Sequence, residues 1–309
     1  MKTNNRLLNN FLLALKSKGR SQNTINSYEI DNVQLLNYIR ENKNLTASIN
    51  TFDKEFFNSI EYQDLEFYMN YLTGKEEAES TRARKTTSIR EFFKYITKIK
   101  VIIVNPALDM ETPKIPERKP VYFDLEESIK LLNSVNKKNN HNRNKERDYA
   151  ILTIFLNCGL RRKEMTLIDI DHIKGDLLTV IGKGNKERTV ILTPACLSAI
   201  EKYLKVRPQV NEKALFLSEI KERISDKSVY TLVKNYIGKA GLDTEKYSTH
   251  SLRHVAATLM YKYGGDIIAV KEALGHGNIS TTQIYTHIDK EQQRKVANSN
   301  PLSSIISNI

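Results

Sequence analysis

Three prolines, Pro113, Pro116 and Pro120, stand close together in a basic segment and constrain the fold more than any other feature. Proline lacks an N–H donor and restricts the residue before it, so such a cluster favours extended chain over helix. We therefore predict a linker over residues 113–120. It divides the chain of 309 residues into an N-terminal domain, 1–112, and a C-terminal domain, 121–309, each long enough to bury a core of its own.

Before the linker, apolar residues recur at helical spacing. The pattern from Leu8 to Leu15 predicts a first helix that ends near Gly19. Ser21 is a suitable N-cap for a second helix. A third helix is expected over Leu65 to Leu72, and a fourth begins near Ser80. The N-terminal domain is therefore predicted to be wholly helical.

The fourth predicted helix has one apolar face and one basic face. Phosphate groups of DNA attract such basic faces, but a solvated helix surface has the same composition, and both interpretations stay open. The basic residues are Arg82, Arg84, Lys85, Arg90 and Lys94.

Composition narrows the class of partner. The formal net charge of +12 indicates an acidic partner, either a nucleic acid or an anionic membrane surface. No apolar run approaches the roughly 20 residues that span a bilayer, and the N-terminus does not resemble a secretory signal. The two cysteines, Cys158 and Cys196, form no disulfide framework, and this favours a reducing, cytoplasmic setting. Cys158 is expected to be a small core residue.

After the linker, the pattern predicts helices over 124–135 and 149–156, with Gly159 ending the second. Short alternating runs then predict a β-hairpin, and helices are expected to resume near Thr193 and continue to the end of the sequence. The two predicted strands are Leu177–Ile181 and Arg188–Leu192. The expected fold class is therefore mainly α, with two domains and a small antiparallel sheet in the second.

Gly159 is followed by Leu160-Arg161-Arg162-Lys163-Glu164. If one helix ends at Gly159 and the next begins at once, Arg161 stands at a helix start and can present its planar fork to a phosphate. Glu164 could hold that guanidinium in place. A plain surface helix with an (i, i+3) ion pair would give the same pattern.

Four further positions carry side chains that suit phosphate chemistry, each with an ordinary structural alternative. Lys183 lies between two glycines of the predicted hairpin, where a solvated turn residue is the common case. His250 and Arg253 are three residues apart and would share a helix face, as a catalytic pair or a buried structural one. His276 follows Gly275, which would end a helix and leave the histidine at a tight corner.

Tyr285 follows nine residues later, in a short stretch where a tyrosine is usually a core or interface residue. The combination of these motifs in one chain is a more specific signal of function than any one of the motifs alone. In order, the stretches GLRRKE, GKGNKER, HSLRH, LGH and STTQIYTH resemble the catalytic domain of the tyrosine recombinase and phage integrase family. The stretches GRSQNTINSY, STRARKTTSIREFFKY, NPA and PKIPERKP are similar to that family's helical, SAM-like core-binding domain. The two-domain layout is that of the Xer-type members.

This resemblance implies a set of catalytic roles. Tyr285 would attack a backbone phosphate and form a 3′-phosphotyrosyl intermediate, with His250 as the base. Arg161 and Arg253 would clamp the nonbridging oxygens. Lys183 would protonate the departing deoxyribose hydroxyl, and His276 would donate a hydrogen bond to the same phosphate. Glu164 would support the first arginine.

The resemblance also implies partners. Both domains would clasp duplex DNA that carries paired inverted repeats. A homo-tetramer, alone or with a paralogous recombinase, would exchange strands through a Holliday junction. The candidate DNA contacts are Arg82, Arg84, Lys85 and Arg90 of the fourth predicted helix, together with Arg162. The chemistry calls for no cofactor, metal or ATP, and the expected setting is cytoplasmic and nucleoid-associated, without a membrane.

Two alternatives stay open at this point. A type IB topoisomerase-like enzyme would use the same phosphotyrosine chemistry to relax supercoils without exchanging partners. A DNA-binding regulator on the same scaffold would bind a sequence without cutting it. The apolar end of the chain, Leu302 to Ile309, needs a groove in which to bury itself, and we expect it to dock into a neighbouring subunit.

Overall fold

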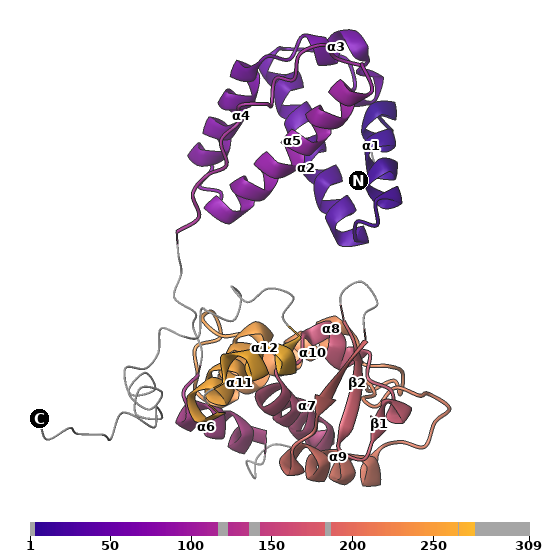
Figure 1. The fold of residues 1–309 in the computed structure, drawn as a ribbon, viewed down its shortest axis with the longest axis vertical. Coiled ribbons are helices and arrows are strands. Elements are labelled where there is room, and N and C mark those ends of the chain that lie inside the picture. Colours follow the sequence, from indigo (N-terminus) through magenta and orange to yellow (C-terminus); the bar gives the residue numbers. More distant parts are fainter. Residues whose placement is uncertain (1–3, 117–122, 136–142, 183–186, 265, 276–309) are drawn as a thin grey trace, which may run out of the picture. The chain divides into compact units, whose positions relative to one another are not determined.

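The computed structural model describes residues 4–116, 123–135, 143–182, 187–264 and 266–275 (Figure 1). The chain divides into two compact units, 1–118 and 119–309. The described residues are mainly helical and include one small antiparallel sheet, so the predicted fold class is confirmed. The finer boundaries of 1–112, 113–120 and 121–309 stay a proposal. Among the helices of the described residues, none is long and apolar enough to cross a membrane.

The N-terminal unit is a bundle of helices, and the first two begin at residues whose side chains cap them. The side chain of Asn5 accepts hydrogen bonds from the N–H groups of Leu7 and Leu8 and so caps the first helix, and Ser21 caps the second as predicted. The bounds are α1 (Arg6–Ser17), α2 (Gln22–Asn42), η1 (Ile49–Thr51), α3 (Lys54–Asn58), α4 (Tyr62–Gly74) and α5 (Glu79–Lys98). The short elements η1 and α3 were not predicted from the sequence.

Aromatic side chains fill the centre of this unit. The fully buried ring of Phe92, on α5, has its centre 5.4 Å from that of the Phe11 ring and 5.6 Å from that of the Phe57 ring. Both pairs meet edge to face. Such edge-to-face pairs add to the free energy gained by burying the rings. The apolar face predicted for the fourth helix is therefore the face that closes the core.

The C-terminal unit surrounds one buried helix. Its elements are α6 (Leu125–Val135), α7 (Lys145–Cys158), α8 (Arg162–Thr166), η2 (Ile170–His172), β1 (Ile173–Lys174), β2 (Leu177–Ile181), β3 (Glu187–Ile191), α9 (Pro194–Val206), α10 (Asp226–Lys239), α11 (Thr249–Gly264) and α12 (Ile267–Leu274). Helix α7 is buried from Ala150 to Leu156 and packs against α6, α9 and α11. Cys158, in its last turn, is a core residue as predicted.

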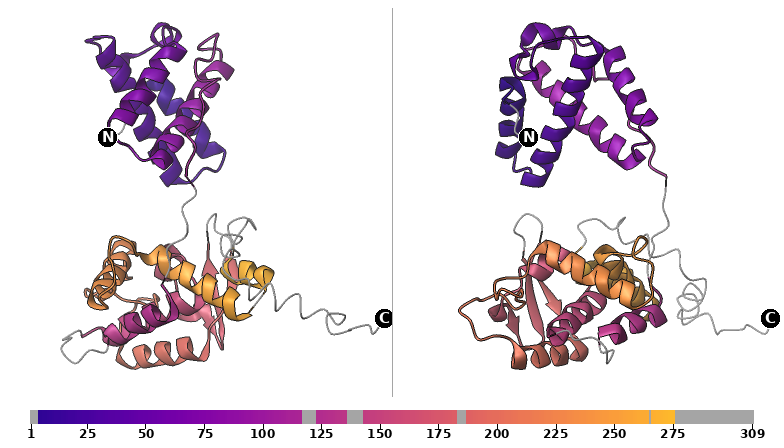
Figure 2. Two further views of the ribbon diagram at one scale, coloured as in Figure 1. Left: turned by 90° about the vertical axis from the view of Figure 1, so that its left-hand side faces the viewer. Right: turned by 180° about the vertical axis from the view of Figure 1, so that it is seen from behind.

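The sheet has the order β1-β2-β3 and is antiparallel, with Thr179 opposite Thr189. It lies at one side of the C-terminal unit, and α6 lies at the other (Figure 1, Figure 2). Strand β3 begins one residue earlier than predicted, and β1 adds a strand that the sequence pattern did not indicate.

The expectation of helices throughout the chain after Thr193 is wrong for residues 207–225. This segment is irregular, and its ordered contacts include isolated bridges of Ala214 with Asp169 and of Leu217 with Arg223. The buried guanidinium of Arg207 explains the path, because it donates hydrogen bonds to the main-chain carbonyls of the loop that follows. A helix would have kept those carbonyls for its own N–H groups.

Candidate active site

Arg161 stands between two helices. Gly159 ends α7 with a φ of 58°, a left-handed conformation that suits glycine, and Arg161 is the N-cap of α8. The buried carboxylate of Glu164 accepts hydrogen bonds from the main-chain N–H of Arg161 at 2.8 Å and from its guanidinium at 2.7 Å. The two geometric predictions for this motif, a helix start at Arg161 and its restraint by Glu164, are confirmed.

Arg253, on α11, approaches the same place from another direction. Its side chain is buried, and its guanidinium donates to the carbonyls of Gly159 and Leu274, each at 2.6 Å. The guanidinium of Arg161 donates to the carbonyl of Gly275 at 3.2 Å. Two arginines that are far apart in the sequence therefore meet at the C-terminal end of α12, where the helix dipole favours positive charge.

His250 lies on α11, one turn before Arg253. Loss of surrounding water, and then the positive charges of Arg253 and Arg161, lower the pKa of its imidazole below the ordinary value of 6.5. The ring of His254 packs edge-on against it at 4.5 Å, and burial followed by the charges of His250 and Arg253 lowers the pKa of His254 to about 4. Both imidazoles are thus neutral at pH 7.

Glu164 is the negative charge among these arginines. Burial acts most strongly and raises the pKa of its carboxyl. The hydrogen bond from the N–H of Arg161 and the charges of Arg188 and Arg161 together outweigh it, so the pKa lies below the ordinary value of 4.5. Glu164 is therefore ionised at neutral pH. Arg188, which donates to this carboxylate at 3.0 Å, is a site residue that the sequence reasoning missed, although it lies in the GKGNKER stretch.

Three of the predicted catalytic positions, Lys183, His276 and Tyr285, lie outside the described residues. Gly275 does end α12, with a φ of 64°, as the sequence predicted. The structure thus brings together Arg161, Glu164, His250 and Arg253.

The basic residues predicted on one face of α5 do not all lie there. Lys85 is buried, and its ammonium donates to the carboxylate of Glu77 at 2.6 Å. The expectation that Lys85 lies on the exposed basic face of this helix is therefore wrong, because its ammonium is buried in an ion pair with Glu77; a contact of Lys85 with DNA stays a prediction. Arg84 forms an ion pair with the buried carboxylate of Asp31.

The other candidate DNA contacts differ in how exposed their side chains are. Arg90 is exposed on α5, whereas most of the Arg82 side chain is covered and its guanidinium donates to Thr73 at 2.6 Å. Arg162, on α8, donates to the carboxylate of Asp226 at 2.8 Å. Of these three, Arg90 is the side chain that the described residues leave most accessible.

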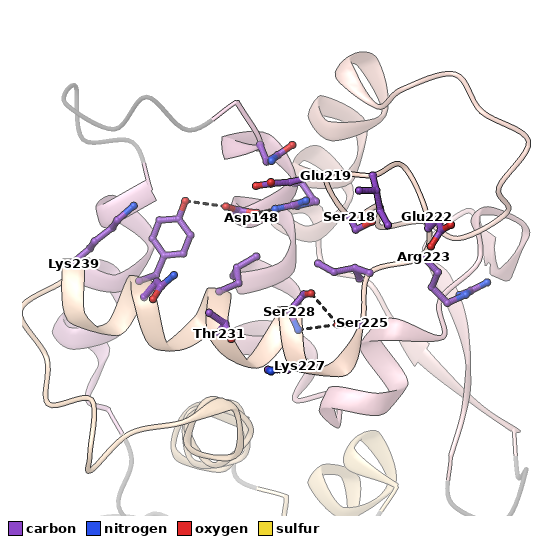
Figure 3. A pocket seen from close by; sticks show the side chains of 17 residues that line it. Asp148, Ser218, Glu219, Glu222, Arg223, Ser225, Lys227, Ser228, Thr231 and Lys239 are labelled. Carbon is purple, nitrogen blue, oxygen red and sulfur yellow. Dashed lines mark hydrogen bonds and ion pairs between the residues drawn. The ribbon is translucent and has the colours of Figure 1, made fainter.

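Two other features of the C-terminal unit lie apart from Arg161, Arg188 and Arg253. A groove of about 930 Å³ runs beside α10 (Figure 3). None of these three arginines lines it. Asp169, Asp171 and His172 place possible metal-ligating atoms within 4.8 Å of one another. Asp169, however, is paired with Arg223 at 2.5 Å, and Nδ1 of His172 accepts a hydrogen bond from the main chain. These groups hold a surface turn, and we assign them no metal.

Comparison with known proteins gives the same division of the chain. Residues 122–292 match the model of the phage integrase family, and residues 8–100 match that of the phage integrase N-terminal SAM-like domain. Tyrosine recombinase XerC of Caldanaerobacter subterraneus subsp. tengcongensis is 47% identical, over 93% of this chain and 84% of that protein. Tyrosine recombinase XerC of Natranaerobius thermophilus is 34% identical, over 90% of this chain and 94% of that protein.

A solved structure agrees with these sequence relatives. The XerH site-specific recombinase, in a post-cleavage complex with a palindromic difH substrate, has a TM-score of 0.72 and 25% identity to this chain. The match covers 89% of this chain and 79% of that one.

A helical SAM-like domain followed by a mainly helical domain with paired arginines defines a phage integrase-type protein. The chain belongs to the tyrosine recombinases of that family, enzymes that transfer DNA strands at specific sites.

Proposed function

We propose that this recombinase cuts and rejoins duplex DNA through a 3′-phosphotyrosyl bond to Tyr285. The observation that carries the proposal is the convergence of Arg161 and Arg253 on the adjacent carbonyls of Gly275 and Leu274. That helix end immediately precedes the segment that contains the tyrosine. The proposed catalytic residues are Arg161, Lys183, His250, Arg253, His276 and Tyr285, with Glu164 in support.

Fixed positive charge is the main requirement of this chemistry. A phosphodiester repels nucleophiles, and its transition state carries still more negative charge at the nonbridging oxygens. Arg161 and Arg253 supply two guanidinium groups, and hydrogen bonds to main-chain carbonyls already orient both of them. By analogy with a deleted oxyanion-hole donor, loss of either should slow cleavage by about a hundredfold to a thousandfold.

Proton transfer falls to the neighbouring groups. A tyrosine hydroxyl has a pKa of about 10 and must lose its proton to attack. The lowered pKa of His250 keeps its imidazole neutral and able to accept that proton. In this scheme Lys183 protonates the departing deoxyribose hydroxyl, and His276 donates a hydrogen bond to the phosphate. The phosphotyrosyl bond conserves the energy of the broken bond, so rejoining should need neither metal nor ATP.

The proposed substrate is duplex DNA with paired inverted repeats. The palindromic substrate of the related XerH complex supports this choice. A homo-tetramer, alone or with a paralogous recombinase, would exchange strands through a Holliday junction in the cytoplasm. The biological task would be resolution of chromosome or plasmid dimers, or integration and excision of a mobile element.

A plasmid assay tests the proposal against its alternatives. A binding site is first selected from random duplexes, and two copies are placed in one supercoiled plasmid. Recombination predicts two product circles, or an inverted segment when the sites are opposed. Relaxation without rearrangement would instead support the topoisomerase-like alternative. Tight binding with neither product would support the regulator and contradict the proposal.

A further inference from the structure

The C-terminal end of α12 holds three arginines from three different elements. The consecutive main-chain carbonyls of residues 273–275 each accept a hydrogen bond from one of them. In carbonyl order, the donors are Arg188 at 2.7 Å, Arg253 at 2.6 Å and Arg161 at 3.2 Å. The last carbonyls of a helix have no partner within the helix, and they carry its partial negative charge. This helix end therefore attracts and orients the cluster.

Arg188 differs from the other two because it also reaches the buried carboxylate. Its guanidinium donates to Oε2 of Glu164 at 3.0 Å, and the opposite oxygen of Glu164 accepts from Arg161 at 2.7 Å. Arg188 thus joins β3 to both α8 and α12. The Arg188 side chain therefore connects Glu164, which restrains Arg161, to the end of α12, where Arg161 and Arg253 also bind.

The position of Arg188 is closely determined. Its side chain is 16% exposed, and a Cβ added to Gly275 would lie 2.5 Å from its Cδ. Among the described residues, no acceptor bonds its buried Nε. A buried donor without a partner is costly, and the contacts with Ala273 and Glu164 offset that cost and keep the guanidinium in this place. Glycine at 275 is what allows this close approach.

Loss of Arg188 would change the charge around Arg161. Glu164 is shared between the two arginines, so each receives part of its negative charge. Without Arg188, the carboxylate would act on Arg161 alone and draw that guanidinium toward α8. The carbonyl of residue 273 would also lose its donor, and the end of α12 would lose its tie to β3. Both effects weaken the positive charge offered to a phosphate.

We propose that Arg188 is a positioning residue, which aligns the Arg161 guanidinium with the scissile phosphate through Glu164 and the end of α12. The inference rests on the proposed function, because it assigns Arg161 to that phosphate. Arg188 acts through other groups and is not itself assigned a contact with DNA.

The first test compares Arg188→Met with Arg223→Met in the full chain. Arg223 is a matched control, since it also donates to a carboxylate, of Asp169 at 2.5 Å, and to a main-chain carbonyl, of Thr166 at 3.0 Å. Covalent cleavage of a nicked duplex is followed in a single turnover at saturating protein. Arg188→Met should lower the saturating rate constant by about tenfold to a hundredfold, with half-saturation unchanged, because misplacement of a catalytic group by about 1 Å costs about this much. Arg223→Met should cleave like wild type.

A second substrate separates alignment from a general structural defect. When the scissile phosphate is replaced by an uncharged methylphosphonate, the transition state carries less negative charge. A well-aligned guanidinium then stabilises that transition state less. The ratio of wild-type to Arg188→Met rates should therefore shrink toward one. If Arg188→Met does not fold, Arg188→Lys carries the same comparison, because it keeps the charge and one of the two contacts.

Equal rates for wild type and Arg188→Met, an equal loss in Arg223→Met, or an unchanged ratio on the methylphosphonate would each overturn the inference. These outcomes differ from failure of the proposed function, in which wild type itself forms no covalent adduct.

Discussion

Gly159 ends α7 at the point where three parts of the candidate site meet, and its replacement by alanine should be costly. Its φ is 58°, and an added Cβ would lie 2.5 Å from Cδ2 of Leu274 and 3.2 Å from Cβ of Ala256. The left-handed conformation costs an alanine about 1–2 kcal/mol. Crowding of the packed core adds about 1–3 kcal/mol. We expect Gly159→Ala to lower the free energy of unfolding by about 2–5 kcal/mol.

Gly175 provides the control. It has a similar φ of 63°, and a Cβ there would meet nothing within 4 Å. Gly175→Ala should therefore show the conformational cost alone, about 1–2 kcal/mol. Calorimetric unfolding of the full chain measures both variants. In a domain of this size, each kcal/mol lowers Tm by about 2–4 °C.

The difference in stability loss between Gly159→Ala and Gly175→Ala measures the cost of the contact between the added Cβ and Leu274 of α12. Because Leu274 also supplies a carbonyl to Arg253, Gly159→Ala should slow DNA cleavage as well, whereas Gly175→Ala should not. Equal loss of stability in the two variants would refute the reasoning, since it would mean that the contact with Leu274 carries no cost.

Three further predictions concern other parts of the chain. The pKa of His254 is lowered from 6.5 to about 4, so the folded protein binds fewer protons than the unfolded chain between these values. The contribution of His254 to the free energy of unfolding is complete above pH 6.5 and is lost as the pH falls toward 4. Between pH 7 and pH 5, urea unfolding should therefore show a smaller loss of stability for His254→Gln than for wild type. In filter binding, Arg90→Gln should weaken DNA binding and lower its salt dependence by about one phosphate contact. Lys85→Gln should leave the salt dependence unchanged and lower Tm in thermal unfolding. The opposite pattern would contradict the assignment of Arg90 to the exposed face of α5 and of Lys85 to its buried face. Removal of residues 301–309 should leave DNA binding intact in a native gel and reduce recombination, and unchanged recombination would exclude a role for this tail.

Local sequence signals predicted much of this structure. The apolar spacing in the first hundred residues indicated helices correctly, because one face of each must be buried. Gly159 and Gly275 were expected to end helices, and both do so in the left-handed conformation. The restraint of Arg161 by Glu164 was also predictable, since the two are three residues apart in one short motif.

Contacts outside the regular helix and strand spacing were not predictable from the same patterns. Lys85 belongs to a basic stretch, and nothing in that stretch indicates that its ammonium is buried in an ion pair with Glu77. Arg188 pairs with groups on α8 and α12, so its role depends on how these elements pack. Arg207 likewise shapes its loop through carbonyls that a periodicity argument does not consider.

The central claim is the covalent bond between Tyr285 and DNA, and trapping of that bond tests it most directly. Wild type and Tyr285→Phe are each mixed, in EDTA, with nicked duplexes from the flanks of the protein's own gene and resolved on a denaturing gel. The account predicts a protein–DNA adduct with wild type and none with Tyr285→Phe. Tight binding of the same duplexes in a native gel without any adduct, or an adduct that persists in Tyr285→Phe, would contradict it.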